Sequence, residues 1–121
     1  MSFSRRIASL SSEYKKRMTN VLKDSAKEVA DTANTPQAKG GRMPVDTGAL
    51  RASIRAAVGS MPSGESEQVD VGIAMWNPGD TLYIGWLMNY ARFMEYRYGY
   101  VRGAAEKWPD IVRRNASKVK R

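Results

Sequence analysis

The sequence predicts an α+β fold, in which a small antiparallel sheet packs against a long N-terminal helix and a C-terminal helix. Three observations predict it. Apolar residues recur every three or four positions towards both ends of the chain, apolar and polar residues alternate in the middle, and stretches rich in Gly and Pro separate these regions. A chain of 121 residues supports one core rather than two, so we expect a single domain over residues 1–121.

The N-terminal helix is predicted from residue 3 to about residue 32. Its apolar residues are three or four positions apart and share one face: Phe3, Ile7, Leu10, Tyr14, Met18, Val21, Leu22, Val29 and Ala30. Lysines and arginines occupy the opposite face, and neither Gly nor Pro interrupts the pattern. After this helix we expect flexible loops near 33–44 and 59–68, because both are rich in residues that favour turns.

The stretch MPVDTGALRASIRAAV, between the two loops, predicts a turn, a short helix and then a strand near 53–58. Asp46 or Thr47 can accept a hydrogen bond from a free backbone N–H at the helix start, and Gly48 permits an unusual backbone angle. Leu50 and Ile54 are expected to face inward together. The residues of this predicted loop-to-sheet joint are Pro44, Asp46, Thr47, Gly48, Leu50, Arg51 and Ile54.

A hairpin is predicted over the following segment. The alternating stretch QVDVGIAMW has the period of a half-buried strand, with Val69, Val71, Ile73 and Met75 on one side. NPGD is a turn, and 81–88 is expected to return as the second strand. Apolar residues with helical spacing begin at Val101 and predict a C-terminal helix. Pro109 is expected to break this helix near Trp108, and a basic tail follows.

The chain has no cysteine and no histidine. This composition excludes disulfides, thiolate metal sites and imidazole bases. An enzyme that uses carboxylates alone is the remaining alternative, but Asp46, Asp70, Asp80 and Glu95 are scattered without metal-ligand spacing. We therefore expect no catalytic residue, metal or cofactor. No apolar run approaches the roughly 20 residues of a membrane span, so we expect a protein made in a cytoplasm and not associated with a membrane.

The net charge of +8 is unevenly distributed. Residues 1–55 hold eleven Lys and Arg against five Asp and Glu, and residues 92–121 hold nine against three. Residues 56–91 hold four acids and no Lys or Arg. This pattern fits nucleic-acid binding through the basic ends, or self-association in which one copy's acidic surface faces the next copy's basic surface.

Aromatic residues and arginines alternate over 90–102. Three interpretations are open: Tyr90, Phe93 and Met94 belong to the core, the segment anchors a protein interface, or it stacks on single-stranded nucleic acid. Glu95 is expected to pair with a neighbouring arginine rather than to act as a catalyst. The candidate interface residues are Tyr90, Phe93, Glu95, Tyr96, Arg97, Tyr98 and Tyr100.

PVDTGALRASI resembles the signature PVDTGxLRxSI of small tail-component proteins of long-tailed bacteriophages, also called neck, head–tail joining or tail-completion proteins. Tyr90, Ala91, Glu95 and Gly99 are similar to the YAxxxEyG-like segment before the last helix of that family, and the resemblance covers most of the chain. It implies a non-enzymatic virion protein, assembled in the host cytoplasm, that forms a ring at the head–tail junction.

The resemblance also implies partners. They are further copies of this chain, with a hexamer expected, and the neighbouring head-connector and tail proteins. DNA would pass through the ring without sequence-specific contacts, and Asp70 and Asp80 are expected to face this channel because carboxylates do not bind phosphates. The alternative function is a basic nucleic-acid-binding protein that uses the Arg/Tyr-rich segment 90–102.

Overall fold

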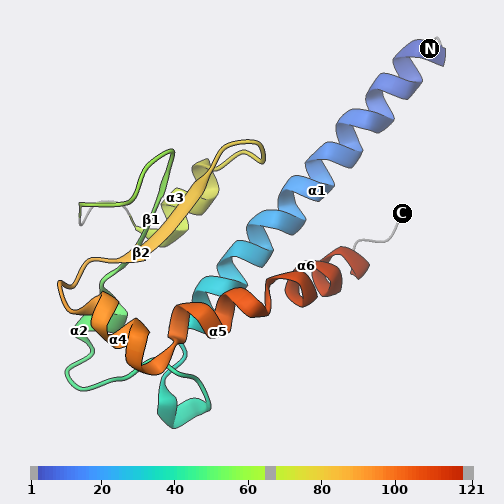
Figure 1. Ribbon diagram of the computed structural model, residues 1–121. Coiled ribbons are helices and arrows are strands. Elements are labelled where there is room, and N and C mark those ends of the chain that lie inside the picture. Colours follow the sequence, from blue (N-terminus) through green and yellow to red (C-terminus); the bar gives the residue numbers. More distant parts are fainter. Residues whose placement is uncertain (1–2, 65–67, 119–121) are drawn as a thin grey trace.

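Helices and a small sheet both contribute to the computed structural model, which describes residues 3–64 and 68–118 (Figure 1). The architecture confirms the predicted α+β class. The elements in chain order are α1 (Phe3–Ala33), the 3₁₀ turn η1 (Gln37–Lys39), α2 (Ala49–Ala52), β1 (Ile54–Val58), α3 (Val69–Met75), β2 (Leu82–Trp86), α4 (Ala91–Tyr98), α5 (Tyr100–Glu106) and α6 (Trp108–Ser117). Within these ranges, no helix combines the length and apolar character that crossing a membrane requires.

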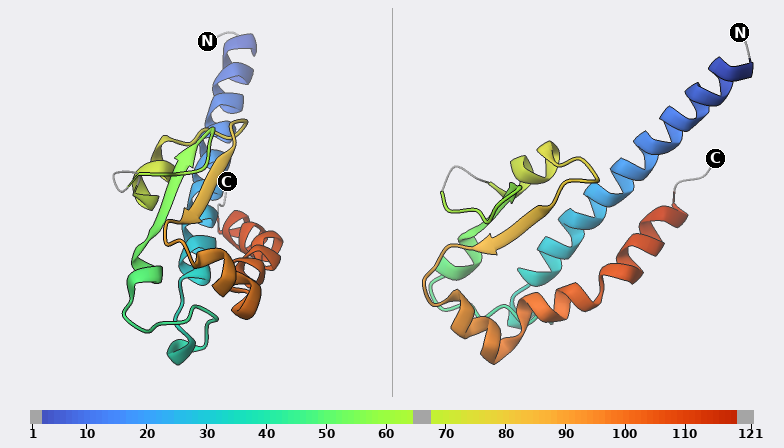
Figure 2. Two further views of the ribbon diagram at one scale, coloured as in Figure 1. Left: turned by 60° about the vertical axis from the view of Figure 1, so that its left-hand side comes forward. Right: turned by 45° about the horizontal axis from the view of Figure 1, so that its top comes forward.

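The long predicted helix is present as α1, whose 31 residues extend over about 45 Å. Its second half is packed inside the fold. The buried residues of this half are Val21, Ser25, Ala26, Ala30 and Ala33, and most of them are small, which lets α5 and α6 approach closely. The first half extends beyond the rest of the molecule (Figures 1 and 2).

A polar cluster fastens α6 to α1. The buried Ser25 hydroxyl donates a hydrogen bond to the Val21 carbonyl oxygen (2.7 Å) and accepts one from Asn115 Nδ2 (3.0 Å). Arg114 forms an ion pair with Glu28 beside this cluster. Because the buried hydroxyl is fully partnered, the cluster fixes the position of α6 without leaving a polar group unsatisfied.

The sheet consists of β1 and β2, which pair antiparallel with Ile54 opposite Trp86 and Ala56 opposite Ile84. One side of β1 is covered by α3. On the other side, Ile84 and Trp86 share a cavity of about 140 Å³ with residues of α1 and α5. The hydrophobic core therefore includes the space between β2 and these two helices.

The strand predicted over 68–76 is wrong, because Val69–Met75 forms the helix α3. Strand 81–88 exists as β2, but it pairs with β1 instead of returning along 69–76. Gly72 explains the difference: its missing side chain lets α3 lie directly on β1, and a Cβ there would be 2.5 Å from the Ala56 carbonyl oxygen. Val71 and Met75 face solvent while Ile73 is buried, so the apolar alternation does not match burial.

A second part of the core forms where the loop after α1 meets α5. Met43 and Leu50 pack against Tyr100, and all three are buried. The rings of Tyr100 and Trp86 meet edge to face with centroids 5.1 Å apart. Trp86 Nε1 donates a hydrogen bond to Asn34 Oδ1 (2.9 Å), which connects the sheet to the end of α1.

The C-terminal helical region is broken twice. The predicted break near Trp108 is confirmed, since α5 ends at Glu106 and Pro109 lies in the first turn of α6. The other break is at Gly99, whose positive φ of 69° ends α4 and starts α5 in a new direction. The predicted basic tail continues past the last described residue, Lys118.

Candidate functional site

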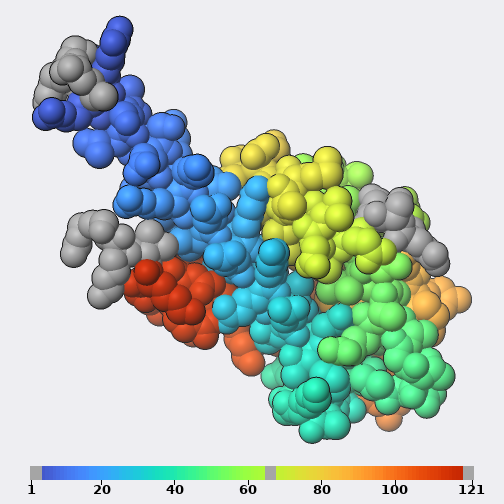
Figure 3. All heavy atoms as spheres, turned by 180° about the vertical axis from the view of Figure 1, so that it is seen from behind, coloured from blue at the N-terminus to red at the C-terminus, as the bar shows by residue number. Residues whose placement is uncertain are grey.

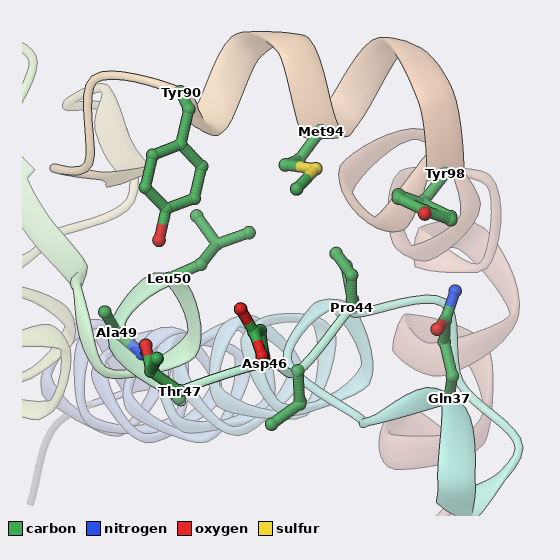
Figure 4. A pocket seen from close by; sticks show the side chains of 11 residues that line it. Gln37, Pro44, Asp46, Thr47, Ala49, Leu50, Tyr90, Met94 and Tyr98 are labelled. Atoms are coloured by element: carbon green, nitrogen blue, oxygen red, sulfur yellow. The ribbon is translucent and has the colours of Figure 1, made fainter.

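The two segments that carry the family resemblance lie opposite each other and form a pocket (Figure 4). The loop 44–50 makes one wall and α4 makes the other, and the cavity between them has a volume of about 560 Å³. Figure 4 shows Leu50 and Met94 facing each other across it, with the Asp46 carboxylate and the Tyr90 hydroxyl pointing inward. We call this cavity the Asp46 pocket.

The loop wall owes its shape to two residues of the PVDTG segment. Gly48 has a positive φ of 87° immediately before α2, a conformation that side-chain-bearing residues rarely adopt. Thr47 Oγ1 accepts a hydrogen bond from the Ala49 backbone N–H (3.3 Å). Of the two predicted capping residues, Thr47 therefore makes the bond and the Asp46 side chain is left to face the pocket.

The rest of the motif joins the loop to the sheet and to α1. Leu50 is buried as predicted, and Ile54, the first residue of β1, is half-buried. Arg51 Nε donates a hydrogen bond to the Asn34 carbonyl oxygen (2.8 Å), and Asn34 Nδ2 donates one to the Arg51 carbonyl oxygen (2.9 Å). Half-buried Pro44 precedes these residues on the pocket wall.

Among the described residues that line the pocket, Asp46 has the only ionised side chain. It is exposed, and its carboxylate has no hydrogen-bond or ion-pair partner within residues 3–64 and 68–118. The walls otherwise consist of aliphatic and aromatic side chains with a few neutral polar groups. This combination is suited to a cation with an apolar stem.

The aromatic segment is divided between three environments. Tyr90 and Tyr98 line the Asp46 pocket. Phe93 is 65% exposed and Tyr96 is 85% exposed, so of the three open interpretations the one that places Phe93 in the core is wrong. Tyr100, which we expected at an interface, is 2% exposed and lies in the core. The helix break at Gly99 causes this division because it turns α5 towards the core.

Glu95 was predicted to pair with a neighbouring arginine, but within residues 3–64 and 68–118 it forms no such pair. Its carboxylate accepts hydrogen bonds from the backbone N–H groups of Val101 (2.7 Å) and Arg102 (3.1 Å). These N–H groups lack helical partners because α5 starts at Tyr100, and a carboxylate is favourable at such a helix start. Glu95 is therefore a structural cap, which became possible only through the turn at Gly99. The guanidinium of Arg97 lies over the Tyr98 ring instead, 5.5 Å from its centroid.

Burial, with smaller contributions from Glu95 and Tyr90, raises the pKa of Tyr100 from 10.0 to about 12. In the unfolded chain the pKa of this tyrosine is near 10, so the folded state stays protonated to a higher pH than the unfolded state. The free energy of unfolding should therefore fall as the pH rises from 10 towards 12. We expect a loss of about 1–2 kcal/mol over this range, allowing for solvent screening at the hydroxyl.

Urea unfolding at a series of alkaline pH values measures this loss, and Tyr100→Phe is the matched variant. It removes the titrating hydroxyl and its hydrogen bond to the Ala91 carbonyl oxygen (3.1 Å) but keeps the ring. Its stability should depend less on pH in this range than that of the unchanged chain. Equal pH dependence in the two proteins would show that Tyr100 titrates normally.

A second candidate site is the first half of α1. We call residues 4–17 the arm, since they are exposed and extend from the body of the fold (Figure 2). Ile7, Leu10 and Tyr14 form an exposed apolar stripe on it, and Leu10 is 62% exposed. The stripe continues the face that Val21 buries further along the helix. Helical periodicity predicted this stripe but not its exposure, which depends on where the other elements end.

The two predicted channel-facing acids are both exposed. Asp70 is in the first turn of α3, and Asp80 is in the turn before β2, where its carbonyl oxygen accepts a hydrogen bond from Trp76 Nε1 (2.9 Å). In the described part of the chain, no group of three or more acids lies close enough to hold a metal ion.

Comparisons with known proteins found no family model, curated protein or solved structure that matches this chain. The two candidate sites are therefore defined by their own geometry. The arm presents an apolar stripe among basic residues, and the Asp46 pocket presents one carboxylate among apolar and aromatic walls.

Proposed function

We propose that this protein is a structural subunit of the head–tail junction of a long-tailed bacteriophage. There, copies of the chain form a ring, as a hexamer, with the head-connector and tail proteins as neighbours. The resemblance of PVDTGALRASI to the phage signature supports the location. The observation that carries the role in assembly is the exposed apolar stripe of the arm.

In an isolated molecule, the exposed apolar stripe contributes little to the free energy of folding. Burying one large apolar side chain contributes about 1.5–3 kcal/mol, and Ile7, Leu10 and Tyr14 do not obtain this contribution within the chain. A helical segment of this length without packing is also marginal in water. A partner that covers the arm would bury the stripe and stabilise the helix at the same time, which supports assembly as the role of this segment.

The charge distribution supports a passage for DNA. Residues 56–91 contain no Lys or Arg, and Asp70 and Asp80 are exposed within this stretch. Most of the attraction of proteins for phosphates comes from basic side chains that release counterions, so this stretch adds little attraction for DNA. In the proposed ring these two carboxylates face the channel, and the DNA slides past them.

Replacing Leu10 with aspartate tests the role of the arm. Leu10 is exposed, so the fold should be retained, but covering the arm would bury an unpaired charge. We expect each contact of the arm to weaken by at least about tenfold, which corresponds to 1.4 kcal/mol, and the yield of joined phage particles to fall as a result. Ser11→Asp is the control, because it adds the same charge to the next exposed residue of the arm. Equal yields from the two variants would contradict a role for the stripe.

The location is tested by electron microscopy with gold-labelled antibodies on purified particles from cells that carry the gene. Label confined to the head–tail junction is the expected result. Particles that contain none of the protein would contradict the proposal, whatever the behaviour of the Leu10 variant.

One observation favours nucleic-acid binding as a second candidate function. Arg92, Phe93, Tyr96 and Arg97 are all exposed on α4, which places aromatic rings and guanidinium groups on one short helix. Such a surface can stack bases and contact phosphates, with strong salt dependence. In the labelling experiment, protein that is absent from particles but bound to DNA in the lysate would support this alternative.

A further inference from the structure

We infer that the Asp46 pocket receives the arm of a second copy of this chain, with Arg6 of the arm paired to the Asp46 carboxylate. This inference rests on the proposed self-assembly and identifies the surfaces that carry it. Four features lead to it: the chemistry of the pocket, the charges of the arm, the exclusion of a neighbouring groove, and the positions of the two surfaces.

The pocket is suited to a long basic side chain. Its volume of about 560 Å³ is within the range of roughly 300–1,000 Å³ that is common for binding pockets. An aliphatic stem can lie against Val45 and Met94 on the pocket walls, and the charged head can then reach the Asp46 carboxylate, which has no partner within the described ranges. The rings of Tyr90 and Tyr98 add surfaces that attract a cation.

The arm supplies such side chains. It carries five basic residues and one acid, Glu13, which is already paired with Arg17 at 3.3 Å. Lys15 and Lys16 lie near the body of the fold, close to where Tyr14 and Lys15 border a hollow with Pro78. Arg6 is exposed near the far end of the arm and shares a face with Leu10, which follows one helical turn later, so it can enter a pocket while the apolar stripe covers its rim.

A neighbouring hollow is a poorer match for the arm. It lies on the other side of α4, has a volume of about 760 Å³ and is lined by apolar residues such as Met61, Phe93 and Tyr96. Among the described residues that line it, the one ionised side chain is that of Arg92. Arg92 would repel the basic arm from this hollow, because like charges that are brought together oppose binding. Asp46 attracts the arm instead.

The arm and the pocket are at opposite ends of the molecule. All views show α1 extending from one end, while the loop 44–50 and α4 lie at the other (Figures 1, 2 and 3). An arm therefore meets the pocket of the next copy in a head-to-tail contact, which closes into a ring where the rotation between copies permits. Until closure, an open oligomer would keep one free arm at one end and one free pocket at the other.

The chain contains no cysteine, so disulfide crosslinking can test the contact cleanly. We expect the double variant Ser9→Cys/Thr47→Cys to form a ladder of crosslinked oligomers under mild oxidation, because Ser9 is exposed one helical turn from Arg6 and its replacement keeps the Arg6 side chain. The control is Ser9→Cys/Lys107→Cys, because Lys107 is exposed but lies between α5 and α6, outside the pocket. A ladder in the control that equals that of the test variant would overturn the inference. Efficient dimers from Ser9→Cys alone would also overturn it, because they indicate contact between two arms.

Charge exchange provides an independent measurement by sedimentation over a concentration series. Asp46→Asn should weaken self-association by about tenfold, and Asp46→Arg should weaken it further. The double variant Asp46→Arg/Arg6→Asp should recover much of the loss. Asp24→Asn is the control, since Asp24 is an exposed acid of α1 outside the pocket.

Equal effects of Asp46→Asn and Asp24→Asn, or no recovery in the exchanged pair, would overturn the inference. So would an unchanged chain that does not self-associate at any concentration. None of these results would contradict the proposed function, because other contacts can hold the protein at the head–tail junction. The gold-labelling experiment tests that location separately. Absence of the protein from particles would reject the proposed function itself. The crosslinking result would then describe only how the isolated protein associates with itself.

Discussion

Replacing Met43 with alanine is expected to lower the free energy of unfolding by about 3 kcal/mol, within the 2–5 kcal/mol typical of such core truncations. Met43 is 0% exposed and packs against Leu50 and Tyr100, so the shorter side chain leaves a cavity. Its backbone is held as well, since its N–H donates to the Thr35 carbonyl oxygen (3.1 Å). The surrounding atoms therefore cannot collapse easily into the space. Urea unfolding followed by circular dichroism measures the change.

Met75→Ala is the matched control. Met75 is 70% exposed on α3, so the same chemical change should alter stability by no more than about 0.5 kcal/mol. If both variants were equally stable, the loop before α2 would not be packed into the core. The Asp46 pocket would then have no fixed wall on the loop side, because Met43 immediately precedes Pro44.

Replacing Gly72 with alanine is expected to destabilise the protein by about 1–3 kcal/mol, although alanine is the better helix former. A new Cβ would lie 2.5 Å from the Ala56 carbonyl oxygen, and the obstacle is backbone in β1 rather than a flexible side chain. The helix α3 must therefore move away from the sheet. On a solvent-facing helix the same substitution would stabilise the protein by up to about 1 kcal/mol. The sign of the change in the free energy of unfolding therefore shows whether α3 lies against β1 at this position.

Ala74→Gly provides the reference for helix propensity, because Ala74 is exposed two residues along the same helix. This variant should lose up to about 1 kcal/mol from the greater freedom of glycine alone. Chemical denaturation of both variants separates the two contributions. A stabilising Gly72→Ala would mean that α3 does not rest on β1, and the packing described for this side of the sheet would be incorrect.

Local patterns predicted most of the elements correctly. The periodicity of α1 and the absence of Gly and Pro predicted its extent closely, and Pro109 predicted the break before α6. The PVDTG turn and the strand after it were also predicted, and the strand is present as β1. These features depend on residues within a few positions of one another, so the information is contained in the local sequence.

The segment 69–75 shows where local patterns fail. Alternating Val, Ile and Met residues have the period of a strand, and β-branched residues favour one. In the fold, β2 already pairs with β1, and Gly72 allows a helix to pack closely on β1. The contact between Gly72 and Ala56 joins positions sixteen residues apart, so periodicity along the segment could not reveal it.

The candidate site was predicted only in part. Asp46 and Tyr90 were singled out separately, for capping and for an interface, but nothing in the sequence places them around one pocket. The role of Glu95 was predicted incorrectly because its partners are backbone N–H groups beyond the turn at Gly99. The nearby arginines in the sequence suggest an ion pair for Glu95. Backbone N–H groups without helical partners can be located only once the ends of the helices are known.

By itself, the sequence determined the α+β class, the long basic helix, the lack of His and Cys chemistry, and the motif that resembles the phage family. Only the tertiary structure decided which half of α1 is buried, that Tyr100 is a core residue, and that loop 44–50 faces α4 across a pocket. The physical reason is that hydrogen-bond periodicity and turn chemistry act over a few residues. Burial, by contrast, depends on which distant segments come together and on where their surfaces end.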